Sequence, residues 1–465
     1  MTLASNPLRS VSTFAAPMLV AVLMAATAST AHAEIVVCGD GQQHATELCD
    51  DGNTVDDDGC DASCTPSGIA AMSHGDGTAC AVTLAGNVKC WGLNDHGQLG
   101  LGHTLVVGDD EDPSDVPFVD LGGSAATAVH TNGEQTFALM TDGSVRAWGL
   151  NDASQLGLGH TADIGDDESP ATATVSTTPQ IGGTVVELSA HGYFACARLD
   201  DGAVRCWGAN DRGQLGYAHT NTIGDDEHPS AAGNVALGGV AVGLATGSEH
   251  ACALLGDGGV RCWGANDYGQ LGYGHTAMIG DDEHPSTAGE IAFDDRAAVQ
   301  LIAGARHTCA LLDDGAVRCW GDNSRGQLGY SGLDAVGDDE SLSDAGDLSL
   351  PAPAVSISAG RAHTCALLQD GALYCWGAND FGQLGRGTVD DAVTLTSTTA
   401  TDLGGMTIEV LYTGATAEKT CALMNDSAVH CWGANDVGQL GRGDTTLAIS
   451  GSESIFVDLM DETIE

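Results

Sequence analysis

The chain has 465 residues, and its 64 Asp and Glu outnumber 15 Lys and Arg, which gives a formal net charge of -49. Because binding to phosphates or to an anionic membrane surface needs clustered Lys and Arg, this balance argues against nucleic acids and anionic membranes as partners. The hydrophobic share of 43% is enough for a packed core, and the 65 glycines favour many turns and hence a β-rich fold.

Residues 1–33 have the pattern of a secretory signal peptide. Arg9 lies in a short basic start, an uncharged apolar run follows from about Phe14 to Thr27, and Ala-His-Ala at 31–33 gives a small-x-small cleavage site. The apolar run is too short for a membrane span, and no second run of that kind follows. We therefore expect an exported protein (periplasmic, cell-surface or extracellular) with no membrane span and a mature chain that begins near Glu34.

Residues 34–67 read as a small acidic cysteine-rich module followed by a linker. The module is too short to bury a core, so we expect two disulfides among its four cysteines, in any of three pairings. Its Asp-Asp-Gly-Asn and Asp-Asp-Asp-Gly strings have the composition of a Ca²⁺ loop, although their spacing does not match the EF-hand, and the alternative is solvated turns. The cysteines are Cys38, Cys49, Cys60 and Cys64, and the candidate metal ligands are Asp50, Asp51, Asn53, Asp56 and Asp58.

The cysteine module resembles the short C-G-D-G and C-D-D-G-N repeats of secreted bacterial proteins. It is also similar to Notch-type cysteine modules that bind calcium. The resemblance covers about 27 residues of the sequence and implies no activity.

Residues 68–465 read as one array of seven repeats. Each repeat contains one Trp followed by Gly and then by N-x-x-x-Q-L-G, as in 266–272, where the motif is complete. A fixed period of this kind indicates a repeat architecture and overrides a domain count made from length. The seven Trp lie at 91, 148, 207, 263, 320, 376 and 432.

Each repeat contains a predicted β-hairpin, and in six of the seven repeats the hairpin carries a pair of cysteines. In the fifth repeat, the runs 308–312 and 316–320 flank Asp-Asp-Gly, which predicts a type I turn closed by Gly at positive φ. In that register Cys309 faces Cys319 at a non-hydrogen-bonded site, where Cα atoms lie about 4.5 Å apart, a distance that a disulfide tolerates. The same ten-residue step predicts the pairs Cys80–Cys90, Cys196–Cys206, Cys252–Cys262, Cys309–Cys319, Cys365–Cys375 and Cys421–Cys431.

The second repeat supports disulfides over the alternative of zinc ligation. It has Phe137 and Ala147 at the two cysteine positions, so both cysteines are absent together, as expected of bonded partners. Zinc sites also prefer ligands two to four residues apart, whereas each repeat offers two cysteines ten apart.

The array resembles the regulator-of-chromosome-condensation repeat family, through W-G-x-N-x-x-G-Q-L-G and the preceding H-x-C-A-L-x-x-D-G-x-V-x-C-W-G. The resemblance covers about 400 residues and implies an all-β, seven-bladed β-propeller of four-stranded blades. Repeat two departs from the pattern at Ser154 and repeat seven at Ser427, where the other copies have Gly. We further expect the terminal segments Ile69–Met72 and Ile455–Leu459 to share one blade and close the ring.

Five repeats carry an acidic Gly-Asp-Asp-Glu insert after Gln-Leu-Gly. Equivalent positions of a propeller lie on one rim, so the inserts are predicted to cluster about fifteen carboxylates around part of a ring. The alternatives are a solvated loop that keeps the protein soluble, cation binding, or a docking face for a basic partner. The candidate residues are Asp109, Asp110, Glu111, Asp166, Asp167, Glu168, Asp225, Asp226, Glu227, Asp281, Asp282, Glu283, Asp338, Asp339 and Glu340.

Repeated histidines are predicted to be structural. His250, His307 and His363 each lie two residues before a cysteine, which favours buried hydrogen bonding over catalysis. A second set follows the Leu-Gly pair and is interpreted as turn residues rather than as ligands beside the acidic inserts. This set comprises His103, His160, His219 and His275.

The sequence contains no H-E-x-x-H, G-x-S-x-G or phosphate-cradling motif, so we expect a non-catalytic protein that requires no cofactor, with Ca²⁺ as a candidate ligand. The leading hypothesis is an exported protein-binding or scaffold propeller, acting as a monomer on an unidentified extracellular or envelope protein. The alternatives are an inhibitor of a secreted enzyme, like the β-lactamase-inhibitory propeller that the resemblance includes, guanine-nucleotide exchange by family resemblance alone, and an unrecognised hydrolase or lyase.

Overall fold

The computed structural model describes residues 68–452 except 292, 393, 396–398, 413 and 426–427. All described residues belong to one compact unit. The predicted signal peptide, the cysteine-rich module with its candidate metal ligands, Ser427 and the segment Ile455–Leu459 lie outside the described residues, so the predictions made for them stay predictions.

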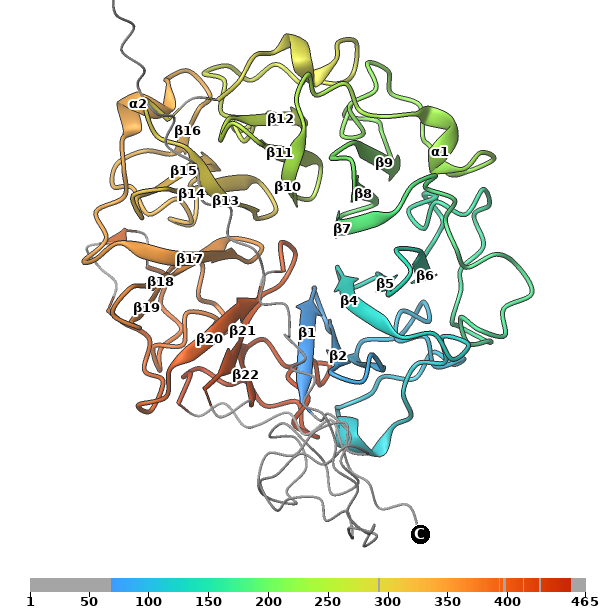
Figure 1. The fold of residues 1–465 in the computed structure, drawn as a ribbon. Helices are drawn as coiled ribbons and strands as arrows, with labels where there is room; N and C mark the ends of the chain where they lie inside the picture. Colours follow the sequence, from blue (N-terminus) through green and yellow to red (C-terminus); the bar gives the residue numbers. More distant parts are fainter. Residues whose placement is uncertain are drawn as a thin grey trace, which may run out of the picture. The chain divides into compact units, whose positions relative to one another are not determined.

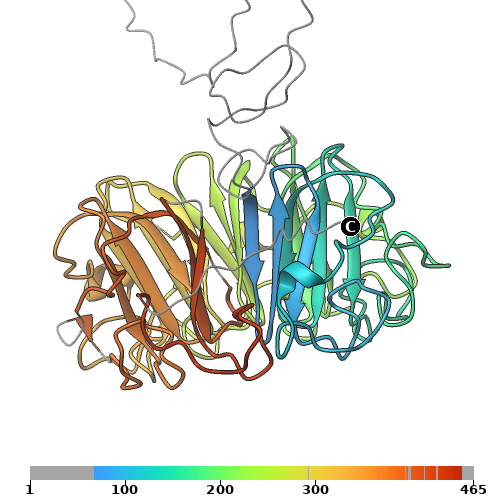
Figure 2. The same cartoon turned by 90° about the horizontal axis from the view of Figure 1, so that it is seen from below.

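The described chain forms seven small antiparallel sheets around a central axis, numbered 1 to 7 here in chain order (Figure 1). The first strand of each sheet is innermost, and its bounds are β1 Ile69–His74, β4 Ala126–Thr131, β7 Val185–His191, β10 Ala241–Thr246, β13 Ala298–Ala303, β17 Ala354–Ala359 and β20 Ile408–Tyr412. Each of these strands contacts the next one around the axis, and β20 contacts β1, which closes the ring. In Figure 2, the same sheets are seen side on.

The second and third strands of each sheet form the predicted hairpin. The second strands are β2 Thr78–Thr83, β5 Gln135–Met140, β8 Phe194–Leu199, β11 His250–Leu255, β14 His307–Leu312, β18 His363–Leu368 and β21 Lys419–Met424. The third strands are β3 Val88–Gly92, β6 Val145–Gly149, β9 Val204–Gly208, β12 Val260–Gly264, β15 Val317–Asp322, β19 Leu373–Gly377 and β22 Val429–Gly433. In sheet 5, Leu312 N donates to Ala316 O at 2.9 Å, and Gly315 closes the turn with φ 83°, as predicted.

The sheets are mostly three-stranded, and the prediction of four-stranded blades is wrong for them. In six sheets the fourth strand is reduced to an isolated bridge to the last glycine of the third strand, as between Gly92 and Val107, and sheets 4 and 6 have one further bridge each, Val260 with Ile291 and Tyr374 with Ala400. Sheet 5 has a two-residue fourth strand, β16 Ala335–Val336. The pairing ends because the chain turns away at the glycine of the acidic insert, for example Gly108 with φ 95°. Within the described residues, the connections contain the short helical turns Pro113–Asp115 (η1), α1 Pro229–Ala232, Pro285–Thr287 (η2) and α2 Leu342–Ala345.

All six disulfides predicted for the array are present, with Cα–Cα distances of 4.0 to 4.2 Å. Each lies within a sheet between paired residues, as Cys309 with Cys319. Where sheet 2 lacks the bond, the Phe137 ring packs edge-on against Trp207 of sheet 3, with ring centroids 6.1 Å apart. Ser154 adopts φ 64°, the left-handed conformation that its glycine counterparts adopt in the other repeats.

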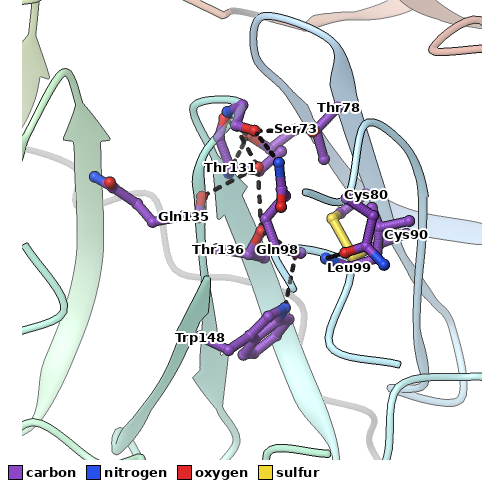
Figure 3. Close-up of a disulfide and its surroundings, with 12 residues drawn as sticks. Ser73, Thr78, Cys80, Cys90, Gln98, Leu99, Thr131, Gln135, Thr136 and Trp148 are labelled. Atoms are coloured by element: carbon purple, nitrogen blue, oxygen red, sulfur yellow. Dashed lines mark hydrogen bonds between the residues drawn. A yellow bond between two sulfur atoms is a disulfide. The ribbon is translucent and has the colours of Figure 1, made fainter. Parts of the chain in front are cut away.

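The repeated Trp and Gln-Leu-Gly join neighbouring sheets. Trp148 Nε1 of sheet 2 donates to Gln98 O of sheet 1 at 2.9 Å (Figure 3). A Cβ on Gly100 would lie 2.8 Å from that nitrogen, so the glycine of the motif makes room for the indole of the next sheet. The same Trp-to-Gln bond recurs at five further boundaries. These residues therefore have the packing role that the sequence predicted.

The motif asparagine and glutamine hold the turn itself. Asn94 Oδ1 accepts from Leu99 N at 2.9 Å, and Gln98 Oε1 accepts from His96 N at 2.8 Å.

The boundary between sheets 7 and 1, where the ring closes, lacks the Trp-to-Gln bond. Trp91 Nε1 is buried there without a hydrogen-bond partner. There Lys419 Nζ donates to Gly75 O at 3.0 Å and to Thr78 O at 3.1 Å.

Candidate binding face

In all seven repeats, the same backbone hydrogen bond holds one equivalent residue at the end of the sheet. It is the residue just before the second strand, and its carbonyl accepts a hydrogen bond from the residue that follows the tryptophan-glycine pair, as Tyr193 O does from Ala209 N at 2.9 Å. We call these residues the lip, and their side chains vary although their backbone does not. The lip consists of Gly77, Glu134, Tyr193, Glu249, Arg306, Ala362 and Glu418.

The lip surrounds a cavity of about 710 Å³, and six of its seven residues line that cavity. The lining also includes Asp76, Asp267, Asp322 and Asp436, with Arg361 as a second cation beside the lip residue Arg306. Acidic groups therefore outnumber basic groups on this surface. Its backbone repeats from sheet to sheet, whereas its side chains vary. Sequence reasoning missed the lip, although the residue before H-x-C-A-L differs from copy to copy and could have indicated it.

Beneath the lip, buried histidines join sheets 4 to 7. His250, His307 and His363 are the first residues of their strands, and each Nε2 lies 2.9 to 3.0 Å from a threonine hydroxyl of the next sheet. Burial lowers the pKa of all three imidazoles, to about 4, 3 and 4, so they are neutral at pH 7. Their structural role, predicted from the repeat, is what the geometry shows.

Small residues accommodate the histidine rings. A Cβ on Gly247 would lie 2.2 Å from His250 Cε1, and the same close approach occurs at Gly304 and Gly360. Sheet 7 has Thr416 at this position, and the buried residue there is Lys419 instead of histidine. Desolvation by burial lowers the pKa of Lys419 to about 7.

Each acidic insert brings its own three carboxylates together. Their ligand atoms lie within 4.8 Å of one another in all five inserts. Desolvation and the adjacent aspartates raise the pKa of Glu168 and of Glu283 to about 7 and raise those of Glu111, Glu227 and Glu340. Oxygen clusters of this kind suit a hard cation such as Ca²⁺, so cation binding stays one of the alternatives for the inserts, beside a solvated loop and a docking face.

The inserts also pack against the preceding sheet. Gly165 lies so close to Gly97 that a Cβ on it would lie 2.3 Å from Gly97 O, and Gly102 N donates to Gly165 O at 3.2 Å. The second histidine set lies in the neighbouring turns, where His160 Nδ1 accepts from Ala162 N at 3.2 Å, which agrees with the predicted turn role. Among the residues that the structure describes, no helix is long and apolar enough to cross a membrane.

The ring of seven antiparallel sheets, six of them with a disulfide, defines a β-propeller. The comparisons give the family: a model of the RCC1-like domain matches residues 164–464, and one of the regulator of chromosome condensation (RCC1) repeat matches 69–98. The chain is 30% identical over 370 residues to the ultraviolet-B receptor UVR8 of Arabidopsis thaliana, covering 78% of this chain and 76% of that protein. The chain therefore belongs to the RCC1-repeat family.

Other relatives and solved structures agree with this assignment. A secretion-regulating guanine nucleotide exchange factor of Bos taurus is 30% identical over 394 residues, covering 78% of this chain and 77% of the relative. The human E3 ubiquitin-protein ligase HERC2 is 29% identical over 387 residues, which are 82% of this chain and 7% of that protein. Yeast RCC1 (Prp20), solved with Kap60, superimposes with a TM-score of 0.59 at 21% identity, over 74% of this chain and 78% of that chain.

Proposed function

We propose that the protein is exported and binds another protein through the lip. The observation that supports this most is the contrast between one backbone bond, which is the same in all seven repeats, and five different residue types at the position that makes it. A position that served only folding would be expected to have the same residue in every repeat, as the Trp and Gln positions do. Interfaces are recognised by such local chemistry rather than by the fold.

The disulfides support an exported location. Six disulfides fit an oxidising environment, which agrees with export by residues 1–33. Guanine-nucleotide exchange, which the names of some relatives carry, is less well supported, because nuclear and cytosolic surroundings keep thiols reduced. Inhibition of a secreted enzyme is one form that the proposed binding can take, with the enzyme as the partner.

Site-specific photo-crosslinking tests the proposal. A photoreactive amino acid placed at Ala362 on the lip should form an adduct with an envelope or extracellular protein in the producing cell, and excess unlabelled protein should compete. Val299 is the matched control, because it is 54% exposed at the opposite end of β13. Adducts at Val299 equal to those at Ala362, or none at Ala362, would contradict the proposal.

A further inference from the structure

Carboxylates on the lip and beside it have an arginine partner in some sheets and none in others. Arg361 lies 3.8 Å from both Asp76 and Glu418, so in the part of the face formed by sheets 6, 7 and 1 a cation offsets part of the negative charge. In sheet 5, Arg306 donates to the Tyr268 hydroxyl at 3.1 Å and lies over that ring.

Sheets 2 to 4 place two acids on either side of an aromatic ring. Glu134 and Glu249 have no ion pair within 4.0 Å among the described residues, and Tyr193 stands between them in the order of the repeats, 46% exposed. The carbonyl of each of these three residues accepts a 2.9 Å hydrogen bond from a backbone N–H, so the backbone that carries each side chain is fixed. The donors are Leu150, Ala209 and Ala265.

The local electrostatics favours a cation at this place. Desolvation raises the pKa of Glu134, and the nearby charges of Asp152 and Asp95 raise it further, whereas His96 and a hydrogen bond to Tyr193 lower it. The negative charge of Glu134 is in turn the largest cause of the raised pKa of the Tyr193 hydroxyl. The carboxylate of Glu134 therefore lies beside an exposed aromatic ring at the edge of a cavity.

We propose that Glu134, Tyr193 and Glu249 form a subsite for a cationic side chain, arginine or lysine, of the bound protein. The inference rests on the proposed function and specifies its partner. The carboxylates offer charge-assisted hydrogen bonds to a guanidinium or ammonium, and the tyrosine ring offers a face for cation–π contact. The cavity of about 710 Å³ leaves space for the side chain to enter.

A pair of peptides that differ only in charge tests the subsite. The probes are acetyl-Gly-Arg-Gly-amide and its citrulline twin, followed by saturation-transfer NMR on the full chain at about 150 mM salt, where exposed charges are screened beyond about 8 Å. We expect the arginine peptide to bind about tenfold more tightly than the citrulline peptide, as for a desolvated cation–π contact with a carboxylate beside it. The double variant Glu134→Gln, Glu249→Gln should abolish that difference.

Matched variants separate the subsite from general attraction to an acidic protein. Glu418→Gln removes one carboxylate charge from a lip residue that already has Arg361 as a partner, and it should leave the preference for arginine unchanged. Tyr193→Phe should retain it, whereas Tyr193→Leu should weaken it about threefold to tenfold because the ring is lost. Thermal melts of all variants show whether the fold is intact.

The outcomes distinguish this inference from the proposed function. Equal binding of the two peptides, or equal losses in Glu418→Gln and the double variant, would overturn the cation subsite. If crosslinks at Ala362 persist in that case, the lip still binds a protein and only the cationic subsite is wrong. If crosslinks and peptide preference are both absent, both proposals fail.

Discussion

His307 Nε2 lies 3.0 Å from Thr364 Oγ1 across the boundary between sheets 5 and 6. Since Thr364 Oγ1 donates to Gln327 O at 2.8 Å, its oxygen accepts a hydrogen bond from the Nε2–H of the neutral His307 imidazole. Gln327 O also accepts from Trp376 Nε1 at 3.0 Å. Histidine, threonine, glutamine and tryptophan of two repeats thus form one hydrogen-bonded chain.

Thr364→Val should destabilise the protein by about 1–3 kcal/mol, because it leaves the buried His307 Nε2 without a partner. Thr364→Ser keeps the hydroxyl and should cost clearly less. Chemical denaturation of both variants measures the difference, and equal free energies of unfolding for Val and Ser would show that the bond across the boundary contributes nothing.

Lys419 should make stability depend on pH above neutrality. Its folded pKa of about 7 lies below the ordinary value of 10.5, so the unfolded chain binds more protons between these values. The stabilising contribution is complete above pH 10.5 and is lost as the pH falls through 7. Relative to Lys419→Met, the wild type should therefore gain up to about 1.4 kcal/mol per pH unit above pH 7. A constant difference between the two proteins across pH 6–10 would contradict the lowered pKa.

The disulfide of sheet 5 can be compared with the natural substitute found in sheet 2. Cys309→Ala with Cys319→Ala should cost about 2–3 kcal/mol through the lost cross-link, in the chain-entropy model. Cys309→Phe with Cys319→Ala copies Phe137 and Ala147 and should cost less, because the phenyl ring can pack against Trp376 as Phe137 packs against Trp207. Differential scanning calorimetry measures the Tm of both double variants. A lower Tm for the Phe–Ala variant than for the Ala–Ala variant would show that Phe137 stabilises sheet 2 only in its own surroundings.

The acidic inserts should lose stability as they ionise. Because the folded pKa of Glu168 and Glu283 is raised to about 7 from 4.5, their contribution is fully present below pH 4.5 and is lost as the pH rises through 7. Glu168→Gln with Glu283→Gln should therefore raise Tm by about 2 °C at pH 8 and change it little at pH 5. Glu409→Gln, an exposed glutamate outside the inserts, is the control, and an equal rise at both pH values would argue against carboxylate repulsion.

The local features of the repeat could be read from the sequence. Cys309 and Cys319 are ten residues apart around a three-residue turn, so local hairpin geometry alone sets their pairing. The packing role of Trp148 and Gln98 could be inferred because both recur in every repeat. The length of the fourth strand could not be predicted in this way, since it depends on how Gly108 packs against the neighbouring sheet.

The amino-acid sequence by itself determined the number of repeats, the hairpins and the cysteine pairs, because each depends on residues near one another along the chain. Only the tertiary structure decided that Glu134, Tyr193 and Glu249 lie on one face, since they are more than 50 residues apart in sequence and the ring brings them together. It also decided that Lys419 replaces histidine where the two ends of the array meet. Contacts of this kind form only when the ring of sheets closes, and the sequence of a single repeat does not specify that closure.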